Sequence, residues 1–168
     1  MKKAAACLLA VLATTAQAEN YVGGNMAFVD YDSDASLKAI VGRLGMTFGE
    51  NLAGEVRLGK GYGTDTIDVS GYNVKVELET MYGVYGRFNM AVSSRAYPYV
   101  IAGYTRGKVK ASISGIGSST DTEGDLSYGF GLDYHVNEKL TINGEYMQYL
   151  DKSGADISAL SIGVSTRF

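Results

Sequence analysis

The sequence has few of the residues that cross-link small secreted proteins or that commonly catalyse reactions. Its 168 residues include one cysteine, one proline, one histidine and no tryptophan. Cys7 lies within an apolar N-terminal segment that we expect to be removed, so we expect neither disulfides nor thiol chemistry in the mature chain. Any histidine-based catalysis would have to use His135.

The N-terminal segment has the three parts of a secretory signal peptide. Met1-Lys2-Lys3 is positively charged, residues 4–13 are apolar, and Ala16-Gln17-Ala18 is a small-residue cleavage site. The apolar part is shorter than the ~20 residues that a membrane-spanning helix needs. We therefore expect a signal peptide over residues 1–18 and one domain over residues 19–168. Loss of Lys2 and Lys3 changes the net charge from −3 to −5, which argues against nucleic acid as a partner.

Residues 19–168 also lack an apolar run long enough for a transmembrane helix, and their apolar residues alternate with polar ones instead. In the final segment, 158–168, Leu160, Ile162, Val164 and Phe168 share one face, and Thr166 adds a hydroxyl to that face. This period of two is typical of a strand. A terminal Phe168 would lie well at a membrane interface.

Eight segments of this kind can be placed along the chain: residues 21–31, 38–48, 52–58, 74–88, 97–110, 126–134, 140–146 and 158–168. We expect loops at residues 30–36, 60–71, 111–125 and 151–155, and shorter turns at residues 49–51, 89–94 and 136–138. Longer connections after odd strands and shorter ones after even strands are typical of an outer-membrane barrel. The pattern therefore predicts an all-β protein: one eight-stranded antiparallel up-and-down transmembrane barrel with both termini in the periplasm.

The predicted periplasmic ends of the strands carry aromatic residues. We expect an aromatic girdle there, made of Phe48, Phe88, Tyr97, Tyr134 and Phe168.

The polar faces of the predicted strands carry charges of both signs. A barrel of eight strands has room only for its own side chains, so apolar residues such as Leu78 and Leu132 would face lipid. The interior charges must then pair, because an uncompensated buried charge is costly. We expect this lumen network to leave no conducting channel, and its members are Arg43, Glu55, Arg57, Glu77, Glu79, Arg87, Asp133 and Glu145.

Several segments resemble one family of proteins. Residues 129–134 (GFGLDY), residues 140–146 (LTINGEY) and the last strand resemble the final strands of the OmpX/Ail-like and OmpA-like outer-membrane β-barrels, and residues 82–88 and 98–104 resemble their middle strands. The resemblance implies a monomer in the cell outer membrane that contacts outer-membrane lipids and lipopolysaccharide. It also implies that the β-barrel assembly machinery recognises Phe168, although Thr166 stands where an aromatic residue is usual.

Two other classes of function remain as alternatives. Barrel enzymes that modify lipid A use a histidine and a nearby serine, but Val136 and Asn137 follow His135 in place of a His-x-Ser spacing. A secreted soluble barrel would have an apolar ligand cavity rather than charged strand faces.

The remaining charged residues predict no catalytic or metal site. The loop acids Asp30, Asp32, Asp34, Asp121, Glu123 and Asp125 are expected to be solvated, although oxygen ligands of this kind can bind Ca²⁺ or Mg²⁺ weakly. Arg106, Lys108 and Lys110 share one face of a strand and could meet lipopolysaccharide phosphates, or lie in the interior or at the rim. We expect no enzyme activity and no cofactor. The predicted role is structural support of the envelope or interaction at the cell surface.

Overall fold

The computed structural model describes residues 19–31, 35–63, 65–69, 72–113, 117–152 and 155–168, so the predicted signal peptide and the loop acids Asp32 and Asp34 lie outside the described residues. Within these ranges no helix has both the length and the apolar character to cross a membrane. The strands are β1 (Asn20–Tyr31), β2 (Ala35–Phe48), β3 (Leu52–Tyr62), β4 (Asp65–Val69), β5 (Tyr72–Asn89), β6 (Ala96–Ile113), β7 (Gly117–His135), β8 (Leu140–Lys152) and β9 (Ala155–Arg167).

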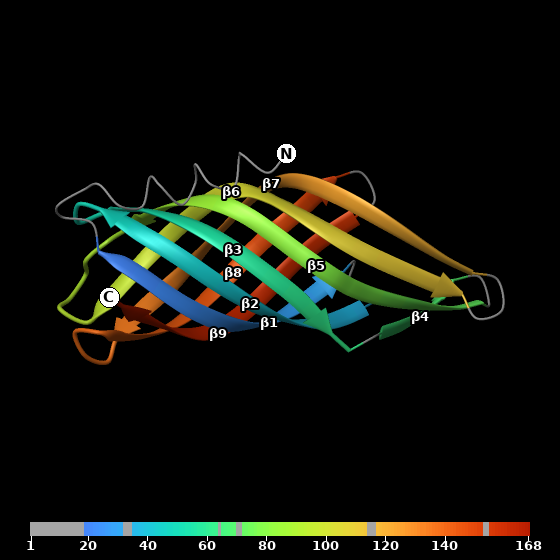
Figure 1. Ribbon diagram of the computed structural model, residues 1–168, viewed down its shortest axis with the longest axis horizontal. Coiled ribbons are helices and arrows are strands. Elements are labelled where there is room, and N and C mark those ends of the chain that lie inside the picture. Colours follow the sequence, from blue (N-terminus) through green and yellow to red (C-terminus); the bar gives the residue numbers. More distant parts are fainter. Residues whose placement is uncertain (1–18, 32–34, 64, 70–71, 114–116, 153–154) are drawn as a thin grey trace.

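Eight of these nine strands close into a barrel (Figure 1). Sequential neighbours pair antiparallel except β3 and β4, β1 pairs with β9, and β3 pairs with β5. The short β4 pairs only with the first residues of β5 and stands outside the closed ring. The predicted fold, an all-β eight-stranded antiparallel up-and-down barrel, is confirmed.

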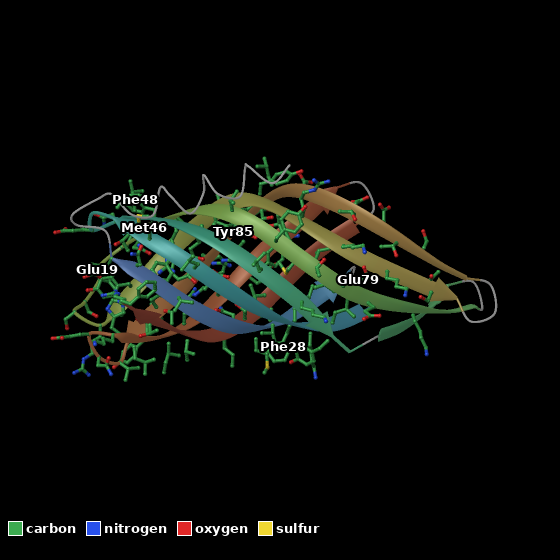
Figure 2. All side chains as sticks on the ribbon, in the orientation of Figure 1. Glu19, Phe28, Met46, Phe48, Glu79 and Tyr85 are labelled. Atoms are coloured by element: carbon green, nitrogen blue, oxygen red, sulfur yellow. The ribbon has the colours of Figure 1, made fainter. Side chains whose placement is uncertain are left out.

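The two ends of the barrel differ. The end that we call the turn end carries the connections after β2, β5 and β7 together with Glu19 and Phe168; the opposite end, which we call the hairpin end, carries β4 (Figures 1 and 2). At the hairpin end β5, β6 and β7, with 18, 18 and 19 residues, extend far beyond the 9–11 residues that cross a bilayer.

This extension corrects the prediction of a loop at residues 111–125. β6 continues to Ile113, β7 begins at Gly117, and the two strands pair along that whole length. β4 likewise lies inside the predicted loop of residues 60–71. The Ser, Thr and Gly residues of 111–125 carry no apolar alternation, so the period of two that marks the other strands is missing there.

The outside of the barrel is apolar. Along β7 the outward residues Leu126, Phe130 and Leu132 are 73%, 62% and 47% exposed, and comparable residues surround the ring. Soluble monomers rarely expose apolar patches beyond a few hundred Å². The outer face therefore meets lipid, as in transmembrane barrels.

Four of the five residues predicted for an aromatic girdle lie exposed at the turn end. Phe48, Phe88, Tyr134 and Phe168 are exposed on the outer face. Tyr97 was wrongly assigned: its ring stacks on His135 inside the mouth of the barrel, at a centroid distance of 4.2 Å.

A β-bulge between Leu78 and Thr80 reverses the facing of β5 towards the hairpin end. Leu78 is 8% exposed and belongs to the interior apolar cluster, so the prediction that it faces lipid is wrong. The alternation of the sequence is also interrupted at this point. Polar Thr80 falls in the apolar register, and apolar Met81, which is buried, falls in the polar one.

At several positions in the interior, a tyrosine ring packs directly against a glycine of a facing strand. A Cβ atom added at Gly131 would overlap the ring of Tyr99, and one at Gly45 would overlap the ring of Tyr21. Gly144 faces outward, and a Cβ atom there would meet nothing within 4 Å. These interior glycines are thus required by the close approach of tyrosine.

Candidate functional site

A layer of six charged side chains crosses the barrel interior, and we call it the charged layer. It consists of three arginines and three carboxylates, so their formal charges sum to zero. Each of the six residues is at most 8% exposed. The members come from β2, β3, β5, β7 and β8, and they are Arg43, Glu55, Arg57, Arg87, Asp133 and Glu145.

Arg57 and Glu145 form the most direct ion pair of this layer. Arg57 donates from Nη1 to Glu145 Oε1 at 2.6 Å and from Nη2 to Oε2 at 2.7 Å. The hydroxyl of Tyr99 donates to Glu145 Oε2 at 2.9 Å. This fork-to-fork geometry is the strong arrangement of an arginine–carboxylate pair, and it ties β3 to β8 across the lumen.

Glu55 joins the other arginines to Arg57. Its Oε2 accepts from Arg57 Nε at 2.8 Å, and its Oε1 accepts from Arg87 Nη1 at 3.3 Å and from the Tyr21 hydroxyl at 2.6 Å. Arg43 Nη1 lies 3.9 Å from Glu55 Oε1. One buried carboxylate therefore has three positive neighbours and a hydroxyl donor, which offsets the cost of removing it from water.

Arg87 completes the layer towards the turn end. Its Nη2 donates to Asp133, and its guanidinium lies 3.5 Å from the centroid of the Tyr99 ring. Arg57 lies 4.8 Å from the centroid of the Tyr85 ring. Tyrosine faces thus hold two arginines that the carboxylates also bind.

The structure places two of the eight predicted lumen residues elsewhere. Glu77 is exposed, and the Oε2 atom of Glu79 lies 2.6 Å from Lys108 Nζ in a pair that is partly exposed. Glu79 is the extra residue of the bulge, and Glu77 lies on its hairpin-end side, where the facing of β5 is reversed; both lie above the apolar band. The hydrogen bond from Lys108 lowers the pKa of the Glu79 carboxyl, against a smaller effect of desolvation.

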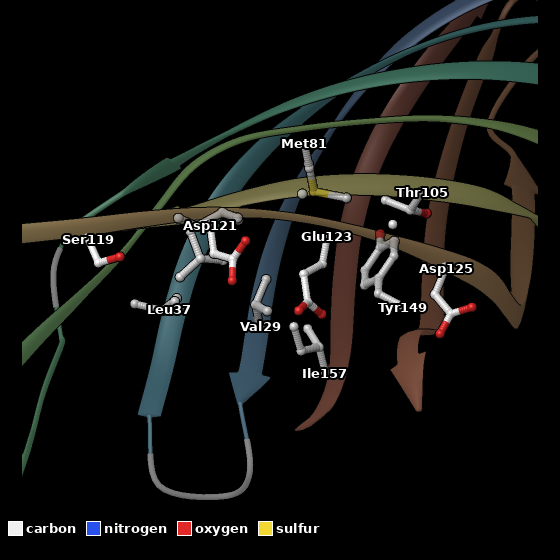
Figure 3. A pocket seen from close by; sticks show the side chains of 14 residues that line it. Val29, Leu37, Met81, Thr105, Ser119, Asp121, Glu123, Asp125, Tyr149 and Ile157 are labelled. Carbon is white, nitrogen blue, oxygen red and sulfur yellow. The ribbon is translucent and has the colours of Figure 1, made fainter. Parts of the chain in front are cut away.

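A cavity of about 390 Å³ opens at the hairpin end, and we call it the hairpin-end cavity. Its walls include Leu78, Met81 and Tyr149, and the acids of β7 stand on its rim (Figure 3). Below it Tyr85, Thr105 and Ser127 are linked through their hydroxyl groups at 2.6 and 2.7 Å. This cavity was not predicted from the sequence, because residues 111–125 were assigned to a loop, whereas in the structure the part of β7 within them forms one wall of the cavity.

A second cavity of about 580 Å³ opens at the turn end and contains His135. The Nε2 atom of His135 lies 2.8 Å from Arg167 Nη2, so the neutral ring can accept a hydrogen bond there, and one ring face stacks on Tyr97. Ser165 lines the same cavity, but its hydroxyl accepts from Arg43 Nη2 at 3.4 Å. Among the described residues, the ring of His135 thus contacts Arg167 and Tyr97.

The two cavities share no lining residue, and the side chains that separate them include Arg57, Glu145 and Tyr99. Within the described part of the chain, no group of three or more acidic, histidine or cysteine side chains is placed to hold a metal ion. The geometry of the layer supports cross-linking of the strands.

A row of basic side chains lies on the outer face of β6. Arg106 and Lys108 are exposed, Lys110 is partly exposed, and all three follow Tyr104 on the lipid-facing side. Thr105 and Val109, between them, line the hairpin-end cavity. The sequence analysis left this row as interior, rim or outer; the structure places it outside, where the strand leaves the apolar band.

The outer membrane protein beta-barrel domain family matches residues 4–168. No curated protein matches the sequence. Among solved structures, the chain is similar to the attachment invasion locus protein Ail of Yersinia pestis, with 17% identity, a TM-score of 0.63 and coverage of 90% of this chain and 97% of that one. It is also similar to the N-terminal β-barrel domain of Pseudomonas aeruginosa OprF, with 14% identity, a TM-score of 0.63 and coverage of 90% of this chain and 100% of that one. A third similar structure is Neisserial surface protein A, with 20% identity, a TM-score of 0.62 and coverage of 89% of this chain and 97% of that one.

Proposed function

The chain belongs to the outer membrane protein beta-barrel domain family and is therefore a multi-pass protein of the outer membrane. We propose that it is a non-catalytic barrel with a sealed lumen, and that it supports the envelope by binding lipopolysaccharide. The binding surface is the basic row of Arg106, Lys108 and Lys110.

The orientation that this proposal needs places the hairpin end outside the cell. Barrels of this kind make short excursions into the periplasm and longer ones outside the cell, and here the longer excursions are β4 and the extended ends of β5, β6 and β7 at the hairpin end. The turn end, which carries Glu19 and Phe168, is then periplasmic, and the sheet of β4 to β7 stands above the outer leaflet.

The observation that carries the proposal is the position of the basic row. It begins one outward position beyond the exposed Tyr104, and the proposal places it where lipid phosphates meet the protein. On the neighbouring strand β5, exposed Lys75 adds a fourth positive charge, while Glu77 and Glu79 contribute two negative charges. The outer face of β5 and β6 therefore keeps an excess of two positive charges, four minus two.

The charged layer supports the second half of the proposal. A layer of three buried ion-paired arginines between two unconnected cavities suits a scaffold better than a pore. We assign it the role of joining β2, β3, β5, β7 and β8 through the lumen.

A second candidate function, adhesion, rests on the same row. The Ail protein of Yersinia pestis was crystallised in complex with the heparin analogue sucrose octasulfate. Sulfate and phosphate groups present the same anionic oxygens to lysine and arginine, so a sulfated glycan on another cell is the alternative source of ligand.

The test compares the wild type with the variant Arg106→Ala, Lys110→Ala, each folded into vesicles with and without lipopolysaccharide. We expect lipopolysaccharide to raise the urea midpoint of the wild type and to raise that of the double variant by clearly less. Lys139→Ala, in the exposed turn after β7, is the control and should keep the full rise. An equal rise in wild type and double variant would contradict the lipopolysaccharide site. Binding of labelled heparin to cells that display each variant tests adhesion separately.

A further inference from the structure

The hairpin-end cavity has an apolar interior built from strands that are distant in the sequence. Its volume of about 390 Å³ lies at the lower end of the roughly 300–1,000 Å³ range of small-molecule sites. The apolar side chains that line it come from β1, β2, β5, β6 and β9, and they include Val29, Leu37, Leu78, Met81, Val109 and Ile157.

One wall of the cavity is acidic. Asp121, Glu123 and Asp125 alternate along β7 on its inward face and all line the cavity (Figure 3). Figure 3 shows the carboxylates of Asp121 and Glu123 directed towards the side on which Val29 and Ile157 lie. Among the residues described as lining the cavity there is no lysine, arginine or histidine.

The three acids are spread along the wall. Same-face neighbours on a strand are about 6.6 Å apart, twice the rise of one residue, and the described acids do not converge as the ligands of one metal ion. The basic row of β6 lies on the opposite, outer side of the sheet, so it does not neutralise this wall. A positive group that enters the cavity would meet carboxylates on one side and apolar surface on the other.

The cavity also has a closed floor. The linked hydroxyls of Tyr85, Thr105 and Ser127 lie below it, and Ser127 donates further to the backbone oxygen of Tyr149 at 3.2 Å. Beneath them lies the charged layer. A ligand that enters from the hairpin end would be held there and would not pass through.

We propose that the hairpin-end cavity binds a small cationic amphiphile, that is, a primary ammonium group carried on a short alkyl chain. The alkyl chain packs against Leu78, Met81 and Ile157, and the ammonium group lies against Asp121 and Glu123. This site goes beyond the proposed binding of lipopolysaccharide, because it lies on the other face of the sheet and selects the opposite charge.

The test uses the full chain in nanodiscs of zwitterionic phospholipid, with empty nanodiscs subtracted, and measures binding of octylammonium, octanol and octanoate by calorimetry. We expect saturable binding of octylammonium at one per barrel, weaker binding of octanol and none of octanoate. The variant Asp121→Asn, Glu123→Gln should weaken octylammonium binding roughly tenfold, which is about 1.4 kcal/mol, and should leave octanol unchanged. Glu138→Gln, in the exposed turn after β7, is the matched control and should bind as the wild type.

A second variant tests the apolar half of the site. Val109→Phe should fill the cavity and abolish binding of both octylammonium and octanol, with folding checked by the shift of the barrel on a detergent gel. The proposal is overturned if octylammonium binds without saturation, if octanoate binds equally well, or if the double acid variant binds octylammonium as tightly as the wild type. The acid variant should keep its full response to lipopolysaccharide, so failure of this site and failure of the proposed function are distinguishable.

Discussion

Replacing Glu145 with glutamine removes one charge from the layer at its best-made ion pair. The wild-type layer holds three positive and three negative charges, and Glu145→Gln leaves three against two. Glutamine keeps the size of the side chain and an oxygen for the Tyr99 hydroxyl, so the change is chiefly one of charge.

The expected cost follows from the neighbours of Arg57. Breaking a buried pair by removal of one partner costs about 3–5 kcal/mol, because a charge is left uncompensated. Arg57 retains Glu55, with Nη2 at 2.7 Å from Oε2, so we expect the lower end, about 3 kcal/mol. The assay is equilibrium unfolding by urea of the protein folded into lipid vesicles.

A double variant distinguishes the charge effect from lost packing. Arg57→Met together with Glu145→Leu leaves two arginines and two carboxylates, so the layer is again neutral, and we expect this variant to be more stable than Glu145→Gln. Glu138→Gln, on an exposed turn, should change the unfolding free energy by less than about 0.5 kcal/mol. A free energy of unfolding for Glu145→Gln within that margin of the wild type would refute the view that the layer is held by balanced charge.

Three other substitutions test packing, facing and assembly. Gly131→Ala should destabilise the barrel by about 1–3 kcal/mol in the same assay, because the added methyl group overlaps Tyr99, whereas Gly144→Ala should cost little; equal costs would contradict the packing argument. Phe130→Arg should cost about 2–4 kcal/mol if this exposed residue lies near the bilayer midplane, and an unchanged free energy would refute the assignment of the lipid face. Phe168→Ala should fold almost normally from denaturant into detergent but accumulate poorly in the outer membrane of cells, because we propose that the assembly machinery reads this residue; wild-type levels in cells would show it to be a girdle residue alone.

The closed barrel was predictable because the lipid-facing residues are apolar and occur at every second position of a strand. Leu126, Phe130 and Leu132 alternate with small and charged residues, and that contrast is strong wherever one side meets lipid. The contrast disappears above the membrane, where both faces of residues 117–125 carry polar groups. The strands there are held by pairing with their neighbours, which no single segment reveals.

The charged residues of the lumen could be proposed from the same alternation, but their partners could not. Nothing in the sequence pairs Arg57 with Glu145, 88 positions away, rather than with another carboxylate. The bulge at Glu79 is similarly hidden, because a one-residue slip moves every later side chain to the other face. The hairpin-end cavity depends on both unknowns, the bulge that turns Leu78 inward and the extension of β7 that raises its acids above the membrane.

The claim on which the whole account depends is that the charged layer seals the lumen between the two cavities. The most direct measurement is the electrical conductance of the purified protein in a planar lipid bilayer, with a porin reconstituted in parallel to show that channels would be detected. The account predicts no steady, reproducible conductance step for this protein. A stable open channel of uniform conductance in the wild type would contradict it.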